Sequence, residues 1–404
     1  MFDVTFARSQ FPAFAKEPTR TWGFFQNAGG SYLPAAVLDR YVEFLTDFKV
    51  QPYGDNPMAK RAGEAMDAGR ATLADLLGVP IDRLTIGPST TQNLNTLANA
   101  FRGNLGPGDE IIVTDQDHEA NIGCWERLCD ETGANLLWWH VDPTSGLLDI
   151  EDLESTLTDA VVVVAMTHVS NVAGVINPVA QVAELVHMRN RFLIVDGVAA
   201  APHMWPHVDA TGADAYLFSL YKTFAPHLGA MVTTPRLLEA VTPQSHFFNT
   251  DVPWKRLDGA GPDHAAIAAL VGLGDYFDTL ADHHGINVAN RAVRVRELSE
   301  LMRAHESELA LPLVELLLSR GTRVIGTTDH PDKVANFSLA PKQPTARSTV
   351  DRLAESQIAA DADHFYAARL VAACGIENVA RISFAHYNTA EEVTRMVDTL
   401  ATVL

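Results

Sequence analysis

The sequence predicts an α/β protein: a large domain built on a mainly parallel, seven-stranded sheet, followed by a smaller C-terminal α/β domain. Short and continuously apolar runs alternate with helical stretches through most of the chain, which is typical of parallel strands covered on both faces. With 404 residues, the chain is long enough to divide into one large and one smaller domain. The seven apolar runs that we assign to the sheet are 84–86, 110–114, 136–141, 161–166, 192–195, 215–218 and 230–233.

Helices of the large domain are indicated by apolar side chains at helical spacing. The first pattern, 34–48, begins at Pro34, a favoured residue in the first turn of a helix, and the second, 58–77, stops at Gly78. Shorter patterns lie between the predicted strands, and two long ones come after them. These remaining patterns are 92–101, 121–132, 150–157, 179–188, 265–282 and 286–305.

After Pro312 the pattern changes to a smaller mixture of strands and helices. We therefore place the domain boundary in the 305–312 region, with residues 31–305 in the large domain and residues 306–404 in the small one. Residues 1–30 are expected to form an N-terminal segment that contributes to the functional site. In the small domain we predict strands at 323–325, 335–339, 358–360 and 380–384, and helices at 348–356, 366–373 and 390–400.

Charge and composition exclude several classes of partner. Fifty acidic residues against thirty basic ones give a net charge of −20, which argues against a nucleic-acid partner because neutralising phosphates requires a basic surface. The N-terminus lacks the basic region and apolar core of a secretory signal, and no apolar run approaches the ~20 residues that span a bilayer. Three cysteines give no disulfide framework. We therefore expect a cytoplasmic protein without membrane association, and no metal site, because the histidines lack ligand spacing with acids or thiols.

A lysine and an acid that each follow a predicted strand give the most informative signal. Asp196 ends the run 192–195, and Lys222 follows the run 215–218 in the segment F-S-L-Y-K. In parallel sheets such positions meet at the carboxyl ends of the strands, where ligands bind. Pyridoxal 5′-phosphate (PLP) needs both groups: a lysine that forms the Schiff base, and an acid that keeps the pyridine nitrogen protonated. The pair therefore predicts that Lys222 holds PLP covalently.

The stretch G-P-S-T-T-Q-N-L-N lies between a predicted strand and a predicted helix. Its hydroxyl residues Ser89, Thr90 and Thr91, together with the amides at the helix terminus, would make a phosphate cradle. The turn D-H-E-A-N follows another strand end. It offers His118 or Glu119 near the plane of the cofactor.

Two further residues are suited to hydrogen bonds with a cofactor or a substrate. Asn171, in the run after the strand 161–166, could donate to the phenolate oxygen of PLP. Arg381 starts a strand of the small domain, and its planar, permanently charged guanidinium is suited to gripping a substrate carboxylate through two hydrogen bonds.

Four motifs in order, S-N-V-A-G-V-I-N-P, V-D-G-V-A-A-A-P-H, F-S-L-Y-K and Y-N-T-A-E-E-V, resemble the class V aminotransferase family, in the branch of cysteine desulfurases and selenocysteine lyases. The resemblance runs from about Phe25, where F-Q-N-A-G-G-S-Y-L-P is similar to the family's opening turn, to the C-terminus. It implies a fold-type I PLP enzyme that works as a homodimer with active sites at the subunit interface. The residue roles that it implies are the Schiff-base lysine for Lys222, the pyridine-nitrogen partner for Asp196, phosphate binding for Thr90, Thr91 and Ser219, the phenolate contact for Asn171 and the substrate carboxylate for Arg381. In addition we expect cofactor contacts from Ser89, Glu119 and Tyr221, substrate contacts from Asn27, Ala28 and Asn171, and catalytic roles for His118 and Tyr366.

The chain departs from the desulfurase pattern at several positions. H-E-A-N replaces H-H-A-N, which puts Glu119 at the ring-stacking position beside His118. Tyr221 stands where many members have a phosphate-contacting histidine, Ala199 replaces a usual glutamine, and the turn A-G-P-D at 260–263 lacks a phosphate-binding threonine. The loop I-A-A-D-A-D-H-F-Y-A resembles the one that carries the desulfurase nucleophile, and it has Tyr366 at the cysteine position.

These departures determine the expected function. A desulfurase needs a thiolate to take sulfur as a persulfide, which a tyrosine cannot do, and Cys374 is expected to be a buried helix residue. We predict a PLP enzyme that acts on an amino acid through an external aldimine, by lyase, epimerase or aminotransferase chemistry, with Lys222 moving the α-proton. Two alternatives remain: a PLP-binding regulatory or scaffold protein with reduced turnover, and a true cysteine desulfurase or selenocysteine lyase that uses another thiol. Tyr366 would act either as a proton donor or as a packed lid.

Overall fold

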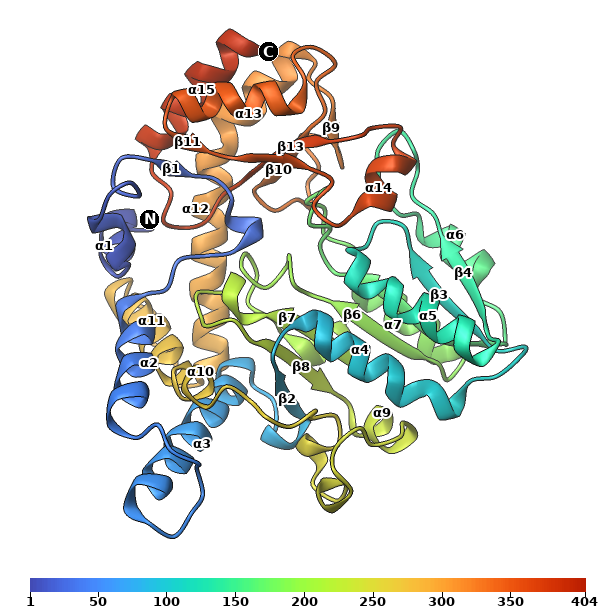
Figure 1. Cartoon of the computed structure of the whole chain (residues 1–404). Helices are drawn as coiled ribbons and strands as arrows, with labels where there is room; N and C mark the ends of the chain where they lie inside the picture. The colour runs from blue at the N-terminus through green and yellow to red at the C-terminus, as the bar shows by residue number, and fades with distance from the viewer.

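A seven-stranded sheet forms the centre of the large domain in the computed structural model, which describes all 404 residues (Figure 1). The strand order is β2-β8-β7-β6-β5-β3-β4. The five strands from β4 to β7 are parallel, whereas β8 is antiparallel to both of its neighbours. The prediction of a mainly parallel, seven-stranded sheet is therefore confirmed. The strands are β2 (Leu84–Gly87), β3 (Glu110–Thr114), β4 (Asn135–Trp139), β5 (Val161–Thr167), β6 (Phe192–Asp196), β7 (Ala215–Ser219) and β8 (Gly229–Thr233).

Both faces of this sheet are buried, which explains why its strands are apolar without alternation. On β5, Val163 and Ala165 belong to one core cluster, and Val164 and Met166 belong to another on the opposite face. One face packs against α4 (Thr90–Phe101), α5 (Gly123–Thr132) and α9 (Pro235–Ala240). The other core contains residues of α2 (Ala35–Asp47), α3 (Pro57–Leu77), α6 (Ile150–Thr156), α7 (Val179–Met188), α8 (Val208–Thr211), α10 (His264–Ala268) and α11 (Leu270–His283).

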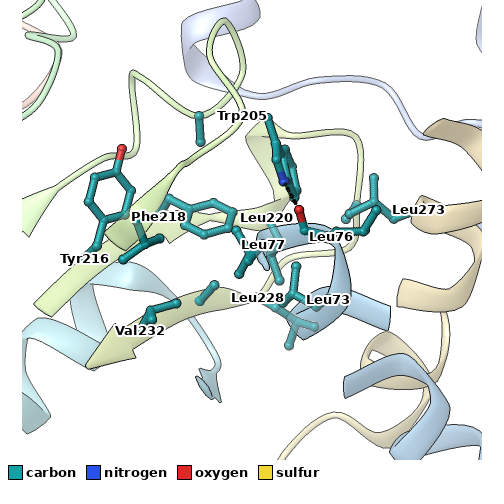
Figure 2. Packing of buried hydrophobic residues seen from close by; sticks show 14 of the residues in the cluster. Leu73, Leu76, Leu77, Trp205, Tyr216, Phe218, Leu220, Leu228, Val232 and Leu273 are labelled. Atoms are coloured by element: carbon teal, nitrogen blue, oxygen red, sulfur yellow. Dashed lines mark hydrogen bonds between the residues drawn. The ribbon is translucent and has the colours of Figure 1, made fainter. Parts of the chain in front are cut away.

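Trp205 connects the sheet to the outer helices. Its indole ring makes edge contacts with Phe218 of β7 and Phe277 of α11, with centroids 5.9 and 5.0 Å away. The indole N–H donates to the carbonyl of Leu76 at 2.7 Å, as Figure 2 shows. A buried N–H that found no acceptor would cost about 1–3 kcal/mol, so this bond allows a polar ring to fill the core.

One long helix, α12 (Arg291–Arg320), serves both domains (Figure 1). Leu298 and Met302 pack in the large-domain core, whereas Leu313 and Leu317 pack in the small-domain core. The predicted end of a helix at residue 305 is therefore wrong, because α12 continues through Pro312. Pro312 is exposed, so the carbonyl that loses its helical partner there can bind water. The predicted helix 265–282 is likewise divided, into α10 and α11.

An antiparallel sheet of four strands, in the order β12-β13-β10-β9, forms the small domain. Its strands are β9 (Val324–Ile325), β10 (Asn336–Leu339), β12 (Asp361–Asp363) and β13 (Val379–Ser383), and its helices are α13 (Ala346–Glu355), α14 (Ala368–Ala373) and α15 (Ala390–Val403). Strand β12 was not predicted. The predicted strand 358–360 is present as β11 (Ile358–Ala359), but it pairs with β1 (Gly23–Phe24) instead of joining this sheet.

The N-terminal segment lies across both domains. Its helix α1 (Val4–Ser9) is anchored near α11, where His284 accepts a hydrogen bond from the Asp3 N–H at 2.9 Å. Further along, β1 joins the small domain, and Ser383 donates to the Phe25 carbonyl at 2.9 Å. No helix combines the length and the apolarity that crossing a membrane requires.

Candidate active site

A cavity opens at the carboxyl ends of the parallel strands, where the sequence predicted a ligand site. Asp196 ends β6, Ser219 ends β7, and Lys222 lies in the short helix η6 (Leu220–Lys222) directly after β7. The cavity wall contains Thr90, Thr91, His118, Ala120, Thr167, Val169, Asn171, Asp196, Val198, Ala199, Ser219, Tyr221 and Lys222. The structure thus brings together most of the residues proposed to hold the cofactor, while the role of each residue stays a prediction. Ser89 and Glu119 do not line this cavity.

Burial controls the protonation of the lysine and the acid. Asp196 is 4% exposed, and desolvation raises its pKa to about 6 against the effects of the Val198 N–H, which it accepts at 2.8 Å, and of Lys222. Desolvation, with a smaller effect from Arg381, lowers the pKa of Lys222 to about 8, although Asp196 acts in the opposite direction. An amine with a pKa of about 8 can release and accept a proton near neutral pH.

The start of α4 forms a cradle suited to an anion. Ser89 caps the helix by accepting the Gln92 N–H at 3.1 Å, and the hydroxyls of Thr90 and Ser219 lie 2.8 Å apart. Gly229 is needed here, because a Cβ at this position would lie 2.5 Å from the Thr90 nitrogen. Free backbone amides at the N-terminus of a twelve-residue helix and nearby hydroxyls are the groups that hold phosphates.

His118, and not Glu119, faces the cavity. Burial, followed by the charges of Lys222 and Arg381, lowers the pKa of His118 to about 4, so its imidazole is neutral at physiological pH. Its Nδ1 accepts the Ala120 N–H at 3.1 Å. The Glu119 carboxylate instead pairs with Arg369 at 3.2 Å. The expected contact between Glu119 and the cofactor is not supported by this geometry, since a turn directs adjacent side chains to different sides.

A second and more open cavity adjoins the first and is lined by Lys222, Arg381 and Tyr366, among others. The guanidinium of Arg381 is 93% removed from solvent, since the residue is 7% exposed. It donates to the Asn171 carbonyl at 3.2 Å and lies 3.7 Å from the centre of the Phe365 ring. Burial lowers the pKa of Arg381 to about 10, so the side chain stays charged at neutral pH. Asn171 donates its side-chain N–H to the Phe365 carbonyl at 2.9 Å, and its Oδ1 atom is buried without a partner.

Tyr366 lies on a strained turn at the mouth of this open cavity. Phe365 and Tyr366 have φ angles of 51° and 59°, which non-glycine residues adopt rarely and mostly at functional sites. The Tyr366 ring stacks on His118 with centroids 5.2 Å apart, and its carbonyl accepts the Glu119 N–H at 2.8 Å. The side chain is nevertheless 68% exposed. The turn thus presents a phenol to the space above Lys222.

The opening turn and Tyr221 border the open cavity in different ways. Ala28 lines it directly, and its N–H donates to the Ser383 hydroxyl at 2.8 Å. The Asn27 side chain is instead engaged within the protein, for it donates to the Ser383 carbonyl at 2.9 Å and accepts from Tyr387 at 2.5 Å. Tyr221 stacks on His227 with centroids 4.5 Å apart.

None of the three cysteines lines either cavity. Cys374 directly follows α14 and is buried, in agreement with its expected structural role. Burial raises the pKa of the thiols of Cys124 and Cys129 to about 12 and about 11, so neither is a thiolate at neutral pH.

Asp117 is a buried acid beside the site that the sequence reasoning missed. Its carboxyl accepts hydrogen bonds from Thr114 at 2.8 Å and from Asn121 at 3.0 Å, and it is 1% exposed. Desolvation and the charge of Asp196 raise its pKa to about 8. The available signal was its position after β3, but His118 and Glu119 next to it were the only residues considered there.

These residues match the chemistry of PLP: a buried amine of lowered pKa, a buried carboxyl across the cavity, and hydroxyls at a helix N-terminus. The fold and the site therefore define a PLP-dependent enzyme of fold type I. The class V aminotransferase family model matches residues 23–396, and the chain belongs to that family.

Comparisons with individual proteins agree. The chain is 33% identical to the aminotransferase-like protein FGM3 of Gibberella zeae, over 100% of this chain and 99% of that protein. It is 31% identical to a probable cysteine desulfurase of Mycolicibacterium paratuberculosis, over 97% of this chain but 57% of the other. Among solved structures, the cysteine desulfurase of Thermococcus onnurineus superposes with a TM-score of 0.87 at 20% identity, covering 100% and 98% of the two chains. The cysteine desulfurase CsdA of Escherichia coli, an S-sulfonic acid form, gives 0.82 at 26% identity and covers both chains fully.

The Asp117→Asn variant is expected to change how stability depends on pH. Between pH 6 and 8, folded Asp117, with a pKa of about 8, holds a proton that an unfolded aspartate, with a pKa of 3.8, has lost. The unfolding free energy of the cofactor-free protein should therefore fall as pH rises through this window. The similar contribution of Asp196 ends near its pKa of about 6. Denaturant unfolding at both pH values should show a smaller fall for Asp117→Asn than for the wild type or for the exposed control Asp351→Asn; equal falls in all three would contradict the assignment.

Proposed function

We propose that this enzyme transforms an amino acid by moving the proton on its α-carbon, in a lyase, epimerase or aminotransferase reaction, and that it does not form a persulfide. The observation that carries the proposal is Lys222, a buried amine with a pKa of about 8 between Asp196 and the charge of Arg381. Such an amine is a suitable base and acid for a proton that moves near neutral pH.

Each side chain of the two cavities has a definable task in this proposal. Bound PLP supplies an electron sink for the bonds at the substrate α-carbon. Thr90, Thr91 and Ser219 hold the phosphate with the N-terminus of α4. Asp196 holds the proton on the pyridine nitrogen, and Asn171 donates to the phenolate oxygen.

The remaining groups serve the ring face and the substrate. The neutral imidazole of His118 covers one face of the cofactor ring. Arg381, which is buried and charged, binds the substrate carboxylate. Lys222 moves the α-proton between the two faces or positions that the reaction requires.

The chemistry of the open cavity argues against persulfide formation. Sulfur transfer needs a thiolate above the substrate, and the loop at that place carries Tyr366, whose phenol can donate a proton but cannot accept sulfur. The thiols of this chain are buried elsewhere. The names of the desulfurase relatives therefore support the family and the cofactor better than they support the reaction.

A homodimer is part of the same proposal. The exposed Phe247 and Phe248, which are 86% and 68% accessible, lie shortly before the exposed turn 260–263 that is similar to the family's cross-subunit turn. Two large exposed aromatic rings favour contact with another chain. A monomeric mass in solution with PLP bound would contradict this association.

Replacing Lys222 tests the proposed site directly. The purified wild type should absorb in the visible range through covalently held cofactor, and its spectrum should change when a substrate amino acid is added. The Lys222→Ala variant should lose that absorbance and at least about 10³-fold in turnover, because it lacks both the attachment point and the base. The exposed Lys342→Ala is the matched control. A wild type that binds PLP but responds to no amino acid would favour a regulatory or scaffold protein instead.

Replacing Tyr366 tests the role of its hydroxyl. Tyr366→Phe keeps the ring on His118 but removes the proton donor, so turnover should fall on the order of 10²-fold with little change in KM. Unchanged turnover would limit Tyr366 to packing. Release of sulfide from cysteine by the wild type, with persulfide formed on the protein, would overturn the argument against a desulfurase.

A further inference from the structure

Two carboxylates stand beside Arg381 on the wall of the open cavity. Strands β12 and β13 are antiparallel, and their register puts Asp361 directly opposite Arg381. Directly opposed residues project from the same face of a sheet, as does Asp363 two positions further along. Ala362 between them is buried, whereas the side chains of Asp361 and Asp363 are 51% and 54% exposed. Both acids line the cavity together with Lys222 and Arg381.

These acids are not neutralised within the protein. Arg381 forms no ion pair with either of them, because its guanidinium contacts the Asn171 carbonyl and the Phe365 ring. Asp361 is 3.4 Å from Arg347, but both side chains are more than half exposed, so this pair is weak. Asp363 has only His364, at 3.7 Å, within ion-pair distance. Asp363 is therefore the freer of the two carboxylates.

The same wall also lacks partners for its buried groups. Arg381 has five N–H donors, of which the protein uses one, and it is 7% exposed. The Oδ1 atom of Asn171, which lines the same cavity, is buried without a hydrogen bond. Buried polar groups without partners are costly, so a ligand with an anionic group for Arg381 is expected here.

A ligand that satisfies this wall carries three charges. Its carboxylate meets Arg381, its amino group lies toward Lys222, and a second cation reaches the acids at the mouth. The exposed ring of Tyr366 and the ring of Phe24 line the path, and aromatic faces attract cations that pass over them. A second carboxylate would be repelled by Asp361 and Asp363, and a short apolar or thiol side chain would leave both acids without a partner.

We infer that the substrate is an amino acid with a cationic side chain, such as a diamino acid or a guanidino amino acid. The inference rests on the proposed function, since it assigns the α-carboxylate to Arg381 and the reacting carbon to Lys222. Asp363 and, to a smaller degree, Asp361 determine specificity in this assignment, and neither takes part in the proton transfer.

Arginine and citrulline provide the sharpest test, because they have nearly the same shape and differ in charge. Dissociation constants are measured on the PLP-bound enzyme from spectral titration with arginine, citrulline, ornithine, norleucine, glutamate and cysteine. Arginine or ornithine should bind at least about tenfold more tightly than citrulline, norleucine or glutamate, and added salt should reduce this difference. Asp363→Asn, which keeps the shape of the side chain, should lower the preference for the cation by about five- to tenfold, and Asp361→Asn by less. Asp351→Asn, on the exposed side of α13, should leave it unchanged.

The outcomes separate this inference from the function on which it rests. Equal or tighter binding of citrulline, norleucine, glutamate or cysteine overturns the inference and leaves the proposed function intact. A preference for cations that survives in the Asp361→Asn, Asp363→Asn double variant also overturns it. An enzyme that binds PLP and responds to none of the amino acids overturns the proposed function, and the inference with it.

Discussion

Removal from water is the physical condition on which this site depends. Burial is the largest cause of the pKa change at each of its ionisable groups: it keeps the proton on Asp117, makes His118 neutral, and lowers the pKa of Lys222 into the range where a base is useful. A buried charge is tolerable only beside another charge or a ligand, and Asp196 and Lys222 compensate one another in part. The packed layers on both faces of the sheet therefore do more than stabilise the fold. They create the dry edge at which these groups acquire their properties.

The sequence was most informative where backbone topology decides position. Residues that follow parallel strands must converge at one edge of the sheet, so Asp196, Lys222 and Asn171 could be expected in one cavity from the strand pattern alone. The apolar runs were equally clear because both faces of the sheet are covered. What the pattern could not give was the direction of a side chain within a turn, and for that reason His118 and Glu119 could not be distinguished before the structure was known.

Other features escaped because their signals are weak or opposed. Strand β12 reads D-A-D, and a three-residue strand with two exposed acids has no apolar run. It is specified by its pairing with β13, which sets Asp361 opposite Arg381 and which no local pattern reveals. A proline in a helical pattern normally indicates an end, yet α12 continues through Pro312, since its two ends are held by different cores. The ion pair between Glu119 and Arg369 likewise joins elements far apart in the chain, and it fixes the turn of Tyr366 from outside the cavity.

The continuity of α12 has a mechanical consequence. Thirty residues of helix extend about 45 Å, and this strut passes without a flexible joint from one hydrophobic core into the other. Relative motion of the two domains must then bend the strut itself, and the stretch between Met302 and Leu313 is where it leaves one core and enters the next. Pro312 removes one rung of the helical ladder at the end of this stretch and so provides the place of least bending resistance. Opening and closing of the cavity would thus be a small elastic rocking of the C-terminal domain, and its amplitude would be limited by the stiffness of a single helix.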